Sequence, residues 1–237
     1  MTTAPHPSSL AVVLVAAGAG RRFGEAKQFK LLQGKPLYQY SLEAFLAADL
    51  VGEIVLVVPE AVVPSVRKEV IPLATTTPPV TVVAGGERRQ DSVLKGVQAL
   101  TLEADIVAVH DAARPFPSQS YLRAGMDLCR QNAGAVVALP SPDTVKQVDP
   151  ATGLIETTLP RERIWLAQTP QFCHRHLLLR LLTEAEQSGR TVTDEATLLE
   201  QAGESVAVIP GSVENRKITA PEDWTWAQHI VQERNQA

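Results

Sequence analysis

A short apolar run that stops at glycine constrains the fold of this chain more than any other feature. Residues 12–15 are apolar and mostly β-branched, and Gly18 and Gly20 follow two alanines later. The run is too short for a buried helix and predicts a buried parallel strand. Glycines after such a strand let backbone N–H groups approach an anion, and Arg22 and Lys27 add cations from the same loop. The segment predicts a site for a phosphorylated nucleotide.

Glycine spacing separates three kinds of phosphate-binding loop. A dinucleotide-binding loop requires glycine where Phe23 stands, and an acid about 20 residues on at a strand end, whereas Glu43 lies in a helical pattern. An ATPase-type loop requires Ser or Thr after Gly-Lys, where this chain has Pro36. The remaining pattern, Ala-Ala-Gly-x-Gly-x-Arg-Phe-Gly-x-x-Lys-Gln, resembles the signature loop of sugar-nucleotide pyrophosphorylases and cytidylyltransferases. A plain strand-to-helix turn would need fewer glycines and no lysine at a fixed distance.

Length and composition indicate a single enzyme-sized domain. The chain has 237 residues and 45% hydrophobic residues, which predicts a disordered lead over 1–9 and one domain over 10–237. Its net charge of −4 provides no global field that would recruit nucleic acid or an acidic membrane. The first apolar run is far shorter than the ~20 residues of a membrane span, so we expect a cytoplasmic protein. Cys129 and Cys173 lie far apart and are expected to be buried thiols.

Strand-like and helix-like segments alternate along the chain. Apolar strand patterns occupy residues 11–15, 54–58, 80–83, 106–109, 135–139 and 205–209. Helical periodicity occupies residues 36–48, 63–70, 92–102, 119–132, 174–187, 194–201 and 221–233. Continuously apolar strands between helices predict an α/β fold with one Rossmann-like, mostly parallel sheet flanked by helices.

A hairpin pattern interrupts this alternation after Pro140. Two strand-like runs, 145–148 and 154–159, flank the turn signal Asp-Pro-Ala-Thr-Gly at 149–153. An isolated two-stranded hairpin is marginally stable in water. We therefore expect residues 141–163 to form a protruding β-hairpin arm that packs against a second copy of the chain in a homodimer.

A second candidate site follows the strand pattern at 106–109. Asp111 stands at the carboxyl end of this strand, where open α/β sheets bind their ligands, and is placed to hold a divalent cation or a substrate hydroxyl. Small Ala112 and Ala113 let a ligand approach the backbone, and Arg114 is expected to bond Asp111 or a phosphate. A capping role would explain Asp111 but not Arg114-Pro115 beside it. His110 is expected to be a packed core residue without a chemical role.

A third candidate site is the Gly85-Gly86 pair and the segment to Ser92. Backbone groups at Gly86 and the hydroxyl of Ser92 suit recognition of the polar edge of a base. Ser92 is equally well explained as a helix N-cap. Arg88 and Arg89, taken alone, are expected on a solvated face.

Together with five later segments, these loops closely resemble the 2-C-methyl-D-erythritol 4-phosphate cytidylyltransferase family, nucleotidyltransferases of the non-mevalonate isoprenoid pathway. The later segments are Asp143-Thr144-Val145-Lys146, Arg161, the run from Trp165 to Gln168-Thr169-Pro170-Gln171-Phe172, Thr193-Asp194-Glu195-Ala196, and Asn215-Arg216-Lys217-Ile218-Thr219. The resemblance covers about residues 10 to 232. One departure is Ala26, where the family usually has proline before the lysine.

The resemblance implies a mechanism in which CMP passes from CTP to 2-C-methyl-D-erythritol 4-phosphate, with pyrophosphate leaving. The implied nucleotide-binding residues are Ala16, Ala17, Gly18, Gly20, Gly86 and Ser92. The implied acceptor-binding residues are Asp111, Ala112, Arg114, Thr144, Arg161, Thr169, Thr193 and Lys217, with Arg161 and Thr193 coming from the partner subunit. Mg²⁺ would bridge the triphosphate near Asp111. The implied catalytic cations are Arg22, Lys27, Arg161 and Lys217, which would stabilise charge on the five-coordinate phosphorus without a covalent intermediate.

Two other functions stay open at this level. The same CTP loops would serve a cytidylyltransferase for another polyol phosphate, such as ribitol 5-phosphate. A non-catalytic nucleotide-binding protein could keep the glycines, although it would have no reason to keep Arg22, Lys27, Asp111 and Lys217 together.

Overall fold

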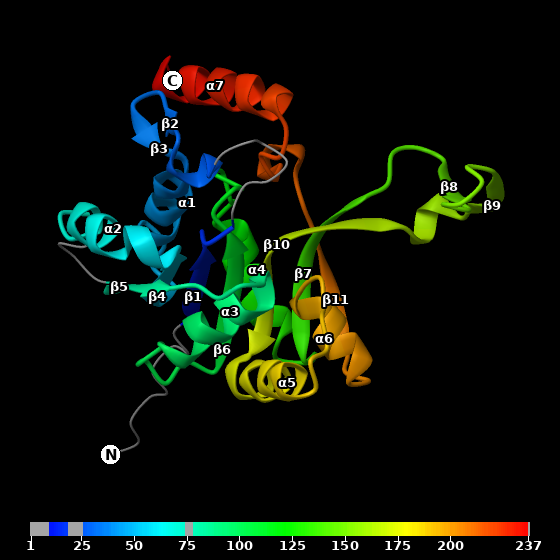
Figure 1. Ribbon diagram of the computed structural model, residues 1–237, viewed down its shortest axis with the longest axis horizontal. Helices are drawn as coiled ribbons and strands as arrows, with labels where there is room; N and C mark the ends of the chain where they lie inside the picture. Colours follow the sequence, from blue (N-terminus) through cyan, green and yellow to red (C-terminus); the bar gives the residue numbers. More distant parts are fainter. Residues whose placement is uncertain (1–9, 19–25, 74–77, 237) are drawn as a thin grey trace.

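A seven-stranded sheet forms the centre of the protein in a computed structural model that describes residues 10–18, 26–73 and 78–236 (Figure 1). Across the sheet the strands are β11 (Val206–Pro210), β7 (Gly134–Pro140), β10 (Trp165–His174), β6 (Ile106–Asp111), β1 (Leu10–Val15), β4 (Val51–Val58) and β5 (Val80–Ala84). Every neighbouring pair is parallel except those of β10, which runs antiparallel to both β6 and β7. The prediction of a mostly parallel α/β sheet is confirmed.

Helices cover both faces of this sheet because its central strands are apolar on both sides. In β1, successive side chains alternate, so Val12 and Leu14 point to one face and Ala11 and Val13 to the other. One face packs against α1 (Leu37–Leu46), α2 (Val63–Val70) and α4 (Ser120–Leu128), the other against α3 (Arg89–Gln98), α5 (Arg175–Gln187) and α6 (Glu195–Gln201). Gly96 lets α3 approach the sheet, since a Cβ there would lie 2.4 Å from a methyl carbon of Val13.

The C-terminal helix packs against a small hairpin at one edge of the molecule. Helix α7 (Pro221–Gln236) lies beside the small hairpin of β2 (Leu31–Leu32) and β3 (Lys35–Pro36) (Figure 1). Leu32 and Leu37 share an apolar cluster there with Ile218 and Trp224. The backbone N–H of Ile218 also donates to Ala113 O at 2.8 Å, which ties the segment before α7 to the loop after β6.

The predicted hairpin is confirmed as β8 (Val145–Val148) and β9 (Ile155–Leu159), which pair with each other and extend away from the main sheet (Figure 1). Leu154 and Ile155 are 69% and 62% exposed at its far end. The arm therefore presents apolar surface to solvent in a single copy of the chain.

The structure differs from the sequence-based expectations in two local features. Strand β10 was not predicted, because its sequence contains a polar stretch with proline. Helix α3 begins at Arg89, so the interpretation of Ser92 as an N-cap is wrong; Asp91 instead accepts a hydrogen bond at 3.0 Å from the backbone N–H of Arg88, the true N-cap residue. Among the described helices, none is long and apolar enough to cross a membrane. The lead at 1–9, together with Gly20 and Arg22, lies outside the described residues.

Candidate active site

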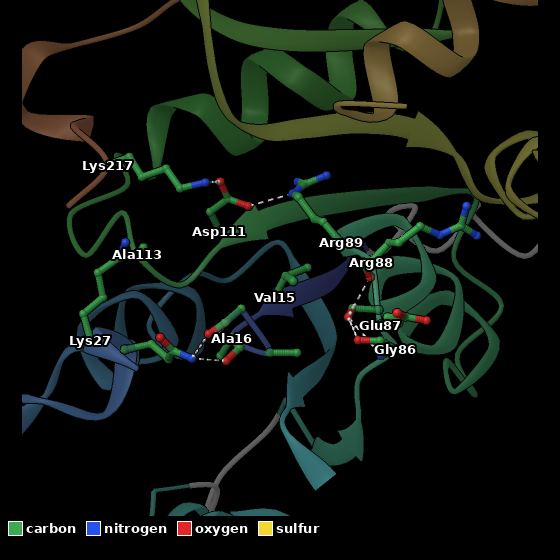
Figure 2. A pocket seen from close by; sticks show the side chains of 14 residues that line it. Val15, Ala16, Lys27, Gly86, Glu87, Arg88, Arg89, Asp111, Ala113 and Lys217 are labelled. Carbon is green, nitrogen blue, oxygen red and sulfur yellow. Dashed lines mark hydrogen bonds and ion pairs between the residues drawn. The ribbon is translucent and has the colours of Figure 1, made fainter. Parts of the chain in front are cut away.

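A cavity of about 510 Å³ opens at the carboxyl ends of β1 and β6 (Figure 2). It joins the three loops predicted from sequence to a fourth segment near the C-terminus. The lining residues are Val15, Ala16, Ala17, Gly18, Lys27, Gln28, Gly86, Glu87, Arg88, Arg89, Ser92, Asp111, Ala113 and Lys217. Four of these are basic and two are acidic, so a chain of net charge −4 has concentrated positive charge in this cavity.

A buried glutamine binds the backbone of the loop after β1. The Nε2 group of Gln28 donates to Ala16 O and to Gly18 O, both at 2.7 Å. Only 4% of Gln28 is exposed, so these bonds form away from competing water. The bonds fix the curvature of the backbone where a phosphate would approach. Sequence reasoning included Gln28 in the signature loop but gave it no role.

The loop after β5 packs closely against the loop after β1. A Cβ on Gly85 would lie 2.4 Å from the Cβ of Ala17, so only glycine allows this approach. The backbone N–H of Gly86 donates to Ser92 Oγ at 3.0 Å. Ser92 thus shapes the Gly86 loop from the first turn of α3, and both predicted base-binding residues lie in one wall of the cavity.

Asp111 lies between two cations at the end of β6. Its Oδ1 accepts a hydrogen bond from Arg89 Nε at 3.0 Å, and its Oδ2 accepts one from Lys217 Nζ at 2.7 Å (Figure 2). Burial by itself would raise the pKa of Asp111, but Arg89 and Lys217 outweigh burial and hold that pKa well below its ordinary value. The carboxylate is therefore ionised at neutral pH.

Arg89 links Asp111 to a buried glutamate on α6. Its two terminal nitrogens donate to Glu195 at 2.6 and 3.1 Å, while its Nε holds Asp111. Burial disfavours the charge on Arg89, but the two carboxylates outweigh it and raise the pKa of Arg89. The expectation that Arg89 lies on a solvated face is wrong, because its guanidinium is bound between two carboxylates. The sequence did not indicate this contact, since Glu195 is 106 positions away.

Arg114 lies in a different environment from the one expected. Its backbone N–H donates to Asp111 O at 2.9 Å, but its guanidinium binds other carbonyls: Nη1 donates to Asn215 O at 2.8 Å and Nη2 to Ala167 O at 3.4 Å. It lines a second cavity of about 250 Å³, together with Leu139, Leu166, Ala167, Gln168, Val213, Arg216 and Lys217. Lys217 lines both cavities and so stands at their junction.

The remaining predicted residues divide into buried and exposed groups. Of the two small residues expected to let a ligand approach the backbone, Ala113 lines the cavity, whereas Ala112 is fully buried in the core cluster. Thr169 is buried, and its Oγ1 accepts from the backbone N–H of Asp111 at 3.0 Å.

Thr144, Arg161 and Thr193, like the buried Ala112 and Thr169, line neither of the two cavities. Thr144 and Arg161 belong to the arm, where Arg161 Nη1 donates to Pro142 O at 3.1 Å, and Thr193 is exposed before α6. Their role across a dimer stays a prediction. Within the described ranges, no three His, Cys, Asp or Glu side chains group together as a potential metal site.

Comparison with known proteins gives one consistent result. The sequence model of the family described as IspD: 2-C-methyl-D-erythritol 4-phosphate cytidylyltransferase matches residues 10–233. The proteins of that name from Geotalea uraniireducens and Solibacter usitatus are each 40% identical, over 93% and 94% of this chain and 95% and 96% of their own. The crystal structure of 4-diphosphocytidyl-2C-methyl-D-erythritol synthase from Anaerococcus prevotii superposes with a TM-score of 0.84 at 26% identity, covering 95% of this chain and 97% of that chain.

Proposed function

Because the chain belongs to the 2-C-methyl-D-erythritol 4-phosphate cytidylyltransferase family, we infer that it transfers CMP from CTP to 2-C-methyl-D-erythritol 4-phosphate. The products are 4-diphosphocytidyl-2-C-methyl-D-erythritol and pyrophosphate. The observation that carries this function is the cationic cavity at the strand ends, whose junction with a second basic cavity is occupied by Lys217. The other two functions considered, a different polyol phosphate and non-catalytic nucleotide binding, are not favoured by the relatives.

We propose that CTP occupies the larger cavity. Its triphosphate would lie along Ala16, Ala17 and Gly18, and its base against Gly86 and Ser92. Lys27, and Arg22 from the undescribed part of the loop, would face the α-phosphate. Fixed cations are effective here because negative charge spreads over the nonbridging oxygens in the transition state, and positive groups already in place stabilise that charge.

We propose that the polyol phosphate spans the junction of the two cavities. Its phosphate would be held by Lys217 and Arg114, and its hydroxyl groups would lie near Asp111. Arg114 is suited to an anion because its buried Nε lacks a hydrogen-bond partner among the described residues. The phosphate monoester is already an ionised nucleophile, so one of its oxygens attacks the α-phosphorus of CTP without a strong general base.

The described residues fit a Mg²⁺ ion that arrives with the triphosphate. One carboxylate with several phosphate oxygens is a common Mg²⁺ donor set, and Asp111 is the proposed protein donor. Both oxygens of Asp111 already accept hydrogen bonds from cations, which disfavours a resident ion without nucleotide. Bound Mg²⁺ would neutralise charge on the phosphates.

We also propose that two copies form a twofold dimer through the arm. The apolar and exposed Leu154 and Ile155 give the arm a surface to bury, and Arg161 on the same arm lines neither of the two cavities described above. In a twofold dimer each arm would deliver Arg161 and Thr144 to the partner's acceptor site.

The direct test is pyrophosphate release from CTP and Mg²⁺ with a panel of polyol phosphates. We expect turnover with 2-C-methyl-D-erythritol 4-phosphate and at least a hundredfold lower kcat/KM with ribitol 5-phosphate. Lys217→Met should abolish most turnover, whereas the matched surface variant Lys68→Met should not. Equal efficiency with both acceptors would overturn the acceptor assignment, and absence of turnover with any of them would overturn the enzymatic function.

A further inference from the structure

His110 is a fully buried imidazole directly before Asp111 in β6. Its Nε2 lies 2.9 Å from Arg114 O, and its Nδ1 lies 3.1 Å from Thr169 Oγ1. The ring also packs edge-on against Phe45, with 5.1 Å between ring centroids. Each ring nitrogen therefore has one polar partner, and the ring is shielded from solvent.

The chemistry of these two partners determines which nitrogen carries the proton. A carbonyl oxygen only accepts hydrogen bonds, so Nε2, facing Arg114 O, must carry a hydrogen and donate it. A neutral imidazole carries one such hydrogen, which leaves Nδ1 as an acceptor. Burial lowers the pKa of His110 to about 4, in keeping with a neutral ring at neutral pH.

This tautomer fixes the direction of the bonds at Thr169. An acceptor at Nδ1 requires a donor, and the only hydrogen on Thr169 Oγ1 is its hydroxyl proton. The same oxygen accepts from the backbone N–H of Asp111 at 3.0 Å. One continuous chain of bonds thus runs from Asp111 N–H through the Thr169 hydroxyl and the His110 ring to Arg114 O.

We propose that His110 is a positioning residue whose Nδ1 accepts the hydrogen bond of the Thr169 hydroxyl, so that Thr169 orients Asp111 and does not donate to the acceptor phosphate. This inference deepens the proposed function and rests on it for the identity of the acceptor. It differs from the role implied by family resemblance, in which Thr169 binds the acceptor. The ring thus connects the two ends of the segment from Asp111 to Arg114: it binds Arg114 O directly and Asp111 N–H through the Thr169 hydroxyl.

The primary test is nitrogen NMR of the full chain labelled with ¹⁵N-histidine and free of ligands at pH 7. Five histidines are present, and the signals that vanish in His110→Asn identify this ring. We expect a neutral ring with its proton on Nε2 and a hydrogen-bonded Nδ1. A proton on Nδ1, or on both nitrogens, would overturn the proposal.

In a second experiment, 2-C-methyl-D-erythritol 4-phosphate and CMP are added to the labelled protein. The ¹⁵N chemical shift of His110 Nδ1 should stay at its ligand-free value if the Thr169 hydroxyl keeps donating its hydrogen bond to that nitrogen. A move of that shift to the value seen in Thr169→Val would show that the hydroxyl turns to the phosphate, and would overturn the proposal.

Matched variants at Thr169 connect this bond chain to turnover. Thr169→Val leaves the Asp111 N–H and His110 Nδ1 unpaired and should raise the unfolding equilibrium constant by roughly 10- to 100-fold. It should also lower kcat while leaving KM for CTP unchanged, and Thr169→Ser should restore both the stability and the ¹⁵N shift. A Val variant as stable as the parent would overturn the inference. Failure of the parent to transfer CMP to any acceptor would instead refute the proposed function, because the tautomer is measured without turnover.

Discussion

Replacing Glu195 with glutamine is the sharpest test of how the cavity is held together. Glu195 is 1% exposed and binds both terminal nitrogens of Arg89, at 2.6 and 3.1 Å. Removing one partner of a buried ion pair costs about 3–5 kcal/mol, since the other charge stays buried. Arg89 keeps Asp111 as a partner, and glutamine keeps one acceptor oxygen, so we expect a loss of about 2–3 kcal/mol.

Urea unfolding followed by circular dichroism measures this loss. With a slope of roughly 1–3 kcal/mol per molar urea, the midpoint should fall by about 1 M. Glu200→Gln is the matched control, because Glu200 is exposed on the same helix and should change stability by no more than about 0.5 kcal/mol. If Glu195→Gln unfolds at the same urea concentration as this control, the ion-pair reasoning is refuted.

Four further predictions concern catalysis, nucleotide choice, assembly and pH. Arg22→Ala and Lys27→Ala should each lower kcat about a hundredfold or more with little change in KM for CTP, and turnover within about threefold of the parent would remove that residue from the mechanism. CTP should be strongly preferred over UTP, at about 1–3 kcal/mol for each polar group left unpaired, which competition kinetics would show. Inactive Arg22→Ala and Arg161→Ala dimers should recover ~25% of parental activity after subunit exchange, whereas heterodimers without activity would place each site within one chain. Burial would raise the pKa of Asp194, but hydrogen bonds from Gln171 and Thr197 outweigh it and lower that pKa, so its charge stabilises the fold above about pH 4 and this contribution is lost on acidification. Asp194→Asn should therefore be less stable than the parent at pH 7 in urea unfolding, and the difference should shrink as the pH falls below about 4.

Sequence patterns located most helices and strands and the three loops at the strand ends. Apolar periodicity and the positions of glycines are local signals, so they can be recognised without knowledge of tertiary contacts. Helix α2 matches its predicted range of 63–70, and β8 matches 145–148. Strand β10 was missed because Gln168, Thr169 and Pro170 lack the apolar pattern of a buried strand. Their polar groups are paired by tertiary contacts, for example Thr169 Oγ1 with Asp111 N–H, which no local pattern shows.

The electrostatics of the site were harder to predict than its location. The sequence placed Asp111 at a strand end, but its two cations, Arg89 and Lys217, lie 22 and 106 positions away. Glu195 stood in a quoted motif without a role because its partner comes from another helix. Arg114 was expected to bind Asp111 or a phosphate, whereas its guanidinium donates to Asn215 O, 101 positions away.

The apolar cluster beneath α7 connects the two segments that bring Lys27 and Lys217 to the cavity. Lys27 precedes the hairpin that contributes Leu32, and Lys217 directly precedes Ile218, and both Leu32 and Ile218 pack in this one cluster with Trp224. The segments that carry the two lysines are thus joined by apolar packing outside the main sheet, in addition to the hydrogen bonds of Gln28 and Lys217 at the strand ends. We expect a protein truncated before α7 to keep every strand of the main sheet but to lose the contact of Trp224 with this cluster, and with it the support for the positions of Lys27 and Lys217.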